Sequence, residues 1–279
     1  MKIDCEGCEY EVLMRRPQTL NGCTIAQSCD QLNYLYFQFS EIRFELKFVS
    51  AYVICMRKEI SVVIVTHNRQ KDVMELIKSL LDQTLKPFEI ILINDESSPP
   101  LNVDYEDEKL KIIRFNKEIG ISKARNYGIK ISQGDYIAFI DDDAVADANW
   151  LKEIQKGIRI GAEVLGSPIK PIFKVPPPKW WNEKDFGAYA GIGNRGRIRG
   201  CNMIISKKVF EKIGLFRTEI SRYKGKLFSG EDEDLVGRAI YKGYRVLFLP
   251  KAIVYHKVPP QRMTLRYILK WEYFFMENL

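Results

Sequence analysis

Residues 136–144 read Tyr-Ile-Ala-Phe-Ile-Asp-Asp-Asp-Ala, an apolar run that stops at three consecutive carboxylates. The apolar part predicts a buried β-strand. Three ionised carboxylates at the end of a central strand would raise one another's pKa unless a cation neutralises them. Alternate residues at a strand end can point the same way, so Asp141 and Asp143 could share one divalent ion, and oxygen ligands suit Mg²⁺ or Mn²⁺. The alternative is an acidic turn that caps a helix near 147–150.

Strands and helices alternate upstream of this run. Apolar β-branched runs predict strands at 60–65, 88–93 and 111–115, and helical spacing predicts helices at 71–81 and 121–131. This alternation implies a parallel sheet with helices on both faces, and in such sheets ligands bind at the carboxyl ends of the strands. Those ends carry residues 66–69, 94–97 and 141–143, so the sequence predicts an acid-rich rim on an apolar sheet.

The second half of the chain is less regular. Residues 170–181 are rich in proline and predict an extended loop. The remaining predictions are strands at 203–205, 244–249 and 253–256, helices at 207–213 and 235–242, and an amphipathic basic-aromatic helix at 262–275.

Composition narrows the classes of function. The net charge of +7 contains no long basic run, which argues against dedicated nucleic-acid binding. No stretch approaches 18 uncharged apolar residues, and the N-terminus lacks the apolar core of a signal peptide, so we expect a cytoplasmic protein. Five of the six cysteines lie in the first 55 residues, but their spacing does not fit a zinc ribbon.

Three further motifs carry polar side chains that suit chemistry. Residues 230–234 read Gly-Glu-Asp-Glu-Asp before an apolar helix, so one of these acids could be a general base, or all could cap the helix. Residues 120–126 combine a glycine turn, two cations and a helix start, which favours phosphate, although a solvated basic turn has the same pattern. His256 ends a β-run and is either a ligand or a core histidine.

Taken in order, these motifs resemble the family 2 glycosyltransferases. The resemblance covers residues 56–256 and implies the GT-A fold, an α/β, Rossmann-like, mostly parallel sheet flanked by helices, with a smaller mixed acceptor-side part. It rests on residues 61–69 (Ser-Val-Val-Ile-Val-Thr-His-Asn-Arg), 91–98, 120–128, the DxD-like 141–143, 200–203 and Glu231-Asp232.

The resemblance also implies roles for individual residues. Asp232 would be the catalytic base. A metal ion would be held by Asp143, Asp141 and His256. The nucleotide sugar would be bound by Thr66, Arg69, Asp95, Gly120, Lys123, Asp141 and Asp142, with Asp95 facing the base and Lys123 reaching the nucleotide. The acceptor side would include Trp180, Trp181, Asn202 and Glu231.

The implied activity is that of a metal-dependent, hexosyltransferase-type enzyme in polysaccharide biosynthesis. It would use Mn²⁺ or Mg²⁺ to move a sugar from UDP, dTDP or GDP to a hydroxyl of a glycan or lipid-linked glycan, with inversion. The basic-aromatic helix at 262–275 permits peripheral contact with the inner membrane face. The alternatives are a non-catalytic sugar-binding relative and a sugar-phosphate nucleotidyltransferase, which needs a glycine-rich loop that residues 66–69 lack.

The beginning of the chain carries a different resemblance. Residues 1–14 are similar to a late motif of FkbM-type methyltransferases, whose glycine-rich cofactor loop would lie well upstream. We therefore expect two parts, a poorly ordered methyltransferase-like remnant at 1–55 and a GT-A glycosyltransferase domain at 56–279.

Overall fold

The computed structural model describes residues 2–5, 8–11, 58–188, 191–192, 197–220 and 230–276, with side chains to residue 273 in the last segment. The chain divides into two compact units, Met1–Met56 and Arg57–Leu279. In the first unit, β1 (Lys2–Cys5) and β2 (Cys8–Glu11) form an antiparallel hairpin. The methyltransferase-like origin of residues 1–55 stays a prediction, and most of that segment lies outside the described residues.

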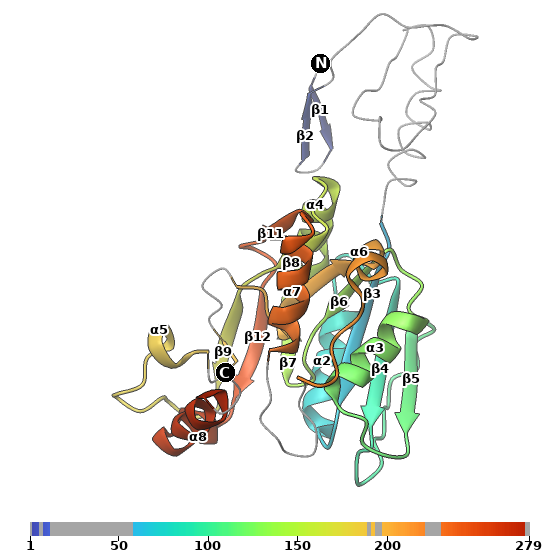
Figure 1. The fold of residues 1–279 in the computed structure, drawn as a ribbon. Helices are drawn as coiled ribbons and strands as arrows, with labels where there is room; N and C mark the ends of the chain where they lie inside the picture. The colour runs from blue at the N-terminus through green and yellow to red at the C-terminus, as the bar shows by residue number, and fades with distance from the viewer. Residues whose placement is uncertain are drawn as a thin grey trace, which may run out of the picture. The chain divides into compact units, whose positions relative to one another are not determined.

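The second unit contains a sheet of seven strands (Figure 1). Their spatial order is β11 (Val246–Phe248), β8 (Val164–Gly166), β10 (Met203–Ser206), β6 (Tyr136–Phe139), β3 (Ile60–Thr66), β4 (Glu89–Asp95) and β5 (Leu110–Phe115). Only β10 runs antiparallel to its neighbours, and the other described pairs are parallel. The predicted mostly parallel sheet is confirmed.

Helices cover both faces of this sheet. Along β3, Val62 and Ile64 face one apolar cluster and Val63 faces the other, as the two-residue period of a strand requires. The first cluster includes α2 (Gln70–Leu81) and α4 (Trp150–Arg159), and the second includes α3 (Ile121–Ile131), α6 (Lys207–Ile213) and α7 (Glu231–Tyr241). Burying each such side chain contributes about 1.5–3 kcal/mol, so the strand ends are held on a rigid frame.

A second, three-stranded sheet brings a distant segment to the end of β6. Its order is β7 (Ala144–Ala146), β12 (Val254–Val258) and β9 (Ile169–Phe173), and His256 pairs with Ala144. The expectation that residues 170–181 form only a loop is wrong at its start, because β9 pairs with β12 there. Pro171 is tolerated because β9 is an edge strand.

The remaining elements are short or lie near the C-terminus. They are α5 (Glu183–Phe186), the 3₁₀ turns η2 (Gly200–Asn202) and η3 (Pro260–Met263), and α8 (Leu265–Met276). Helix α7 begins at Glu231 rather than at residue 235, so all four acids of the motif lie in its first turn, where negative charge stabilises a helix. Within the described residues, no helix is long and apolar enough to cross a membrane.

Candidate active site

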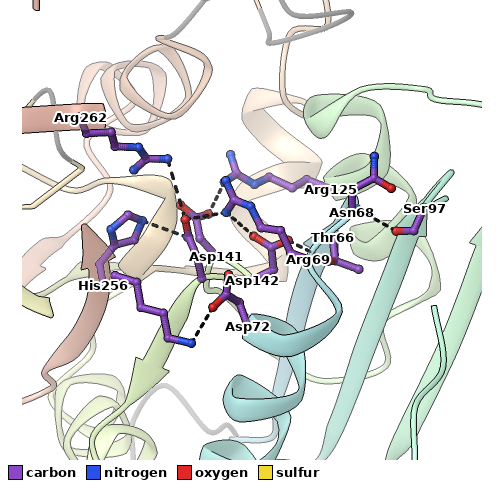
Figure 2. Close-up of polar contacts among 12 residues, drawn as sticks. Thr66, Asn68, Arg69, Asp72, Ser97, Arg125, Asp141, Asp142, His256 and Arg262 are labelled. Atoms are coloured by element: carbon purple, nitrogen blue, oxygen red, sulfur yellow. Dashed lines mark hydrogen bonds and ion pairs between the residues drawn. The ribbon is translucent and has the colours of Figure 1, made fainter. Parts of the chain in front are cut away.

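The three aspartates that follow β6 lie at the carboxyl end of the sheet, where three arginines and His256 approach them from four separate segments. Figure 2 shows Arg69, Arg125, Arg262 and His256 pointing toward them. Asp142 and Asp143 are buried, whereas about a third of the Asp141 side chain, 32%, is exposed. The rim predicted from the sequence is therefore densely paired, and its exposed acid is Asp141.

Asp142 ties the end of β3 to the end of β6. Its carboxylate accepts hydrogen bonds from Thr66 Oγ1 at 2.7 Å and from Arg69 Nη1 at 2.8 Å. Burial raises the pKa of Asp142 to about 6, aided by the charge of Asp143 and opposed by Arg69 and by the bond from Thr66. Thr66 and Arg69 were both predicted to bind the nucleotide sugar, and they meet the acid cluster here.

Asp143 is the most strongly compensated acid. His256 Nε2 lies 3.0 Å from its Oδ1, while Arg69 at 2.5 Å and Arg262 at 3.8 Å approach its Oδ2. Burial acts to raise the pKa of Asp143, but the hydrogen bond from His256 and the charges of Arg69 and Arg262 outweigh it and hold the pKa well below its usual range. Asp143 is therefore ionised at neutral pH.

Arg125 connects the two acid clusters. It is buried, and its guanidinium donates to Asp141 and to Glu231, each at 3.1 Å. Burial acts to lower the pKa of Arg125, but the charges of Asp141, Glu231 and Asp232 raise it. In the sequence, Arg125 is recognised only as one of two cations in residues 120–126, with no role of its own.

A cleft of about 110 Å³ lies beside Arg125 and its two acidic partners, Asp141 and Glu231. Its acidic lining residues are Asp141, Glu231 and Asp232, and its arginines are Arg125, Arg199 and Arg262. Asp232 is held in place because its carboxylate accepts from Gly200 N at 2.7 Å and Glu233 N at 2.9 Å. Asp141 and Asp232, which are 91 residues apart in the numbering, thus line one cleft.

The donor atoms at the strand end fit a divalent cation. Asp141 and Asp143 offer carboxylate oxygens, and His256 is 2% exposed with an Nδ1 that has no hydrogen-bond partner within the described part of the chain. Buried polar atoms normally have partners, so the unpartnered Nδ1 of an imidazole whose Nε2 is paired with Asp143 would suit a metal ligand.

Asp95 and Gly120 form a separate contact. The Asp95 carboxylate accepts from Ile119 N at 2.8 Å and Gly120 N at 2.9 Å, where Gly120 adopts a φ of 85° before α3. Lys123 lies exposed on α3. The structure therefore brings most predicted nucleotide-sugar residues to the strand ends but leaves Lys123 at the surface, where it makes no hydrogen bond or ion pair to the acid clusters among the described residues.

The four predicted acceptor residues lie in different environments. Glu231 lines the cleft, and Trp180 is exposed and stacks edge-on against Phe186. Trp181 is buried against Phe173. Asn202 is fully buried, and its amide is satisfied there: it donates to the carbonyls of Pro168 and Ala252 and accepts from Trp150 Nε1. The contacts of Asn202 and Trp181 are those of residues that hold the site's framework.

Comparison with solved structures places this fold in the GT-A class of glycosyltransferases. The chain is similar to residues 1–349 of TarS from S. aureus, with a TM-score of 0.51 and 20% identity over 71% of this chain and 60% of that one. It is also similar to GalNAc-T7 solved with UDP, GalNAc and Mn²⁺, with a TM-score of 0.56 and 18% identity over 77% of this chain and 48% of that one.

Residues 61–217 match the model of the family described as glycosyl transferase family 2, and the chain belongs to this family. A relative in Bacillus subtilis, the uncharacterized glycosyltransferase YwdF, is 39% identical over 70% of this chain and 73% of its own length. The glucosyl-dolichyl phosphate glucuronosyltransferase of Haloferax volcanii is 29% identical over 72% and 69%, respectively. The succinoglycan biosynthesis protein ExoM of Rhizobium meliloti is 30% identical over 54% and 48%. The chain is therefore a glycosyltransferase that uses a nucleotide sugar.

Proposed function

We propose that this glycosyltransferase moves a sugar from UDP, dTDP or GDP to a hydroxyl of a glycan or lipid-linked glycan, with inversion and with a divalent cation, Mn²⁺ or Mg²⁺. The observation that carries the proposal is that Asp141, one of the predicted metal ligands, and Asp232, the predicted base, line the same cleft. A transferase of this kind needs an anion-neutralising group and a base on either side of one reacting carbon.

The donor would lie at the strand ends. Asp141, Asp143 and His256 would hold the cation, which when bound would neutralise the charge developing on the leaving diphosphate. Thr66 and Arg69 both donate hydrogen bonds to Asp142, which lies between Asp141 and Asp143 in the sequence. Arg125 keeps Asp141 and Glu231 in place through its two hydrogen bonds. Asp95, Gly120 and Lys123 would contact the nucleotide.

Asp232 would act on the acceptor. Its carboxylate removes the proton of the acceptor hydroxyl while the hydroxyl oxygen bonds to the anomeric carbon. The bond between that carbon and the diphosphate oxygen breaks in the same displacement, which inverts the configuration. The backbone bonds from Gly200 and Glu233 fix the carboxylate, so it needs little reorganisation.

The acceptor class is supported by the relatives and by the surface. One relative is named for a dolichyl phosphate substrate and another for succinoglycan biosynthesis. On α8, Leu265, Leu269 and Tyr273 are exposed at four-residue spacing, so they share one face of the helix. This face would suit peripheral contact with a membrane that carries a lipid-linked acceptor. Cytoplasmic location at the inner membrane face stays a prediction.

The test is to separate binding from turnover. Asp143→Ala should remove both cation-dependent nucleotide binding and transfer, whereas Asp232→Ala should lower transfer by about a hundredfold to ten-thousandfold and leave nucleotide binding largely intact. Binding is measured as thermal stabilisation by nucleotide sugars with Mn²⁺. Glu233→Ala is the matched control, because Glu233 follows Asp232 on α7 but does not line the cleft.

Three outcomes would contradict the proposal. Full transfer by Asp143→Ala or Asp232→Ala would remove these residues from the mechanism. Binding of a nucleotide sugar without any turnover by the wild-type chain would favour a non-catalytic relative. Release of pyrophosphate from a nucleoside triphosphate would favour a nucleotidyltransferase.

A further inference from the structure

Cys201 is a cleft residue that the proposed transfer does not use. It lies in η2, is 5% exposed, and lines the same cleft as Asp141 and Asp232. Its neighbour Asn202 anchors the turn through three hydrogen bonds, to Pro168, Ala252 and Trp150. The thiol therefore has a fixed position beside the acid cluster.

The thiol belongs to a group of three potential metal ligands. One ligand atom each from Asp141, Cys201 and His256 lie within 4.8 Å of one another. Bonds to zinc are about 2.3 Å from sulfur and about 2.0–2.2 Å from nitrogen or oxygen, so two ligands on one tetrahedral ion lie roughly 3.3–3.8 Å apart. The limit of 4.8 Å exceeds this range by about 1 Å.

A second observation points to a ligand at this place. Nδ1 of His256 is buried and has no partner among the described residues, although Nε2 is paired with Asp143 at 3.0 Å. Coordination through Nδ1 would leave that pairing intact. A carboxylate on the other ring nitrogen is the usual support of a metal-binding histidine.

We propose that Asp141, Cys201 and His256 form a binding site for a zinc-type cation that overlaps the site of the hard cation. A thiolate and an imidazole favour Zn²⁺ or Cd²⁺, whereas Asp141 with Asp143 offers the oxygens that Mg²⁺ and Mn²⁺ prefer. Both sets share Asp141 and His256, so the two kinds of cation compete. The thiol gives its proton to solvent when the metal–sulfur bond forms.

The consequence for activity rests on the proposed function. A zinc-type ion held by Cys201 would occupy Asp141 and His256 without supporting transfer, so it would inhibit the enzyme. This family member would then be sensitive to traces of Zn²⁺ through a single thiol.

The direct test does not depend on transfer. In the 279-residue chain, the five cysteines other than Cys201 are replaced by serine, namely Cys5, Cys8, Cys23, Cys29 and Cys55. Titration with Cd²⁺ should then produce the ultraviolet cadmium–thiolate absorption, saturating at one equivalent, and adding Cys201→Ser should abolish it. Asp141→Asn and excess Mn²⁺ should each weaken Cd²⁺ binding by tenfold or more.

The outcomes are distinguishable. Absence of the thiolate absorption in the chain that retains Cys201 overturns the site, and absorption that neither Mn²⁺ nor Asp141→Asn weakens overturns the overlap. In transfer assays with Mn²⁺, the Zn²⁺ concentration that halves the rate should be at least tenfold higher for Cys201→Ser than for wild type, with each rate taken relative to the same chain without Zn²⁺. Equal sensitivity of both chains overturns the inhibitory role. A chain that binds Cd²⁺ as described but transfers no sugar contradicts the proposed function alone.

Discussion

Buried carboxylates lie near both ends of strand β3, and the two ends differ in how completely neighbouring donors pair these carboxylates. At the amino end, Glu89 is 2% exposed and accepts from Ser61 Oγ at 2.6 Å, Lys111 Nζ at 2.7 Å and Gln133 N at 2.6 Å. Burial acts to raise the pKa of Glu89, but these donors outweigh it and lower the pKa. This single acid is fully satisfied by neighbouring parts of the sheet.

At the carboxyl end, the carboxylates outnumber the arginines paired with them among the described residues. Five acids gather there, Asp141, Asp142, Asp143, Glu231 and Asp232, and the arginines paired with them are Arg69, Arg125 and Arg262. The partners come from loops and helices far apart in the chain. A carboxylate whose oxygens are all paired, such as that of Glu89, stabilises the fold. Where carboxylates outnumber the arginines paired with them, which is called the acid excess below, they can also bind a cation.

The largest expected effect concerns Arg125. Arg125→Met should lower the free energy of unfolding by about 3–5 kcal/mol, because it leaves Glu231 and Asp141 without their shared buried cation. Urea denaturation measures the loss. If the carboxyl end carries an acid excess, adding Glu231→Gln to Arg125→Met should recover part of the lost free energy of unfolding. Mn²⁺ should then stabilise Arg125→Met more than the wild-type chain.

Exposed Arg217→Met is the control for the loss of an arginine. Arg217 pairs with Asp234 at 3.0 Å and is 61% exposed, so its removal should cost less than about 1 kcal/mol. Equal losses for Arg125→Met and Arg217→Met would contradict the view that Arg125 neutralises a buried acid pair.

The strands and the acid rim could be predicted from the sequence because each depends on a local pattern. Buried β-branched runs such as Ile60–Thr66 have the same appearance wherever they occur, and three aspartates after an apolar run are visible without a structure. Strands β7 and β8 have three residues each, too few to show a period. Strand β9 was not predicted because it contains Pro171 and begins the proline-rich segment, which favours a loop.

Other groups around the acids, such as Arg125, Arg262 and Cys201, could not be predicted because they meet the acids only through tertiary folding. Arg262 and Cys201 lie far along the chain from Asp141, and no spacing relates them. Arg125 did leave a signal, since it shares the buried face of α3 with Ala124 and Ile129. A cation on the apolar face of a helix indicates a buried ion pair. Asn202 had no such signal, because its three partners lie on separate segments.

A smaller effect is expected at the saturated end of the sheet. Glu89→Gln should lower the free energy of unfolding by about 1.5–3 kcal/mol, because the charge-assisted bond from Lys111 is lost while the shape is kept. Lys111 is 43% exposed and can turn to solvent, which limits the loss. Transfer per folded molecule should stay within twofold of wild type. A tenfold fall in transfer with unchanged stability would break the distinction between the two ends.

The smallest effect comes from two hydroxyls of the same strand. Ser61 and Thr66 are both buried, and each donates to a buried carboxylate, Glu89 at 2.6 Å and Asp142 at 2.7 Å. Ser61→Ala and Thr66→Val should each lower the free energy of unfolding by about 0.5–1.5 kcal/mol in urea denaturation, the net value of one hydrogen bond.

The thermal stabilisation of these two variants by Mn²⁺ should differ. Without the bond from Thr66, Asp142 protonates more readily and the strand end loses negative charge, so Thr66→Val should gain less thermal stabilisation from Mn²⁺. Ser61→Ala should gain as much as wild type, because Glu89 lies at the opposite end of the strands. Identical Mn²⁺ responses in the two variants would mean that the acid excess at the carboxyl end does not govern cation binding.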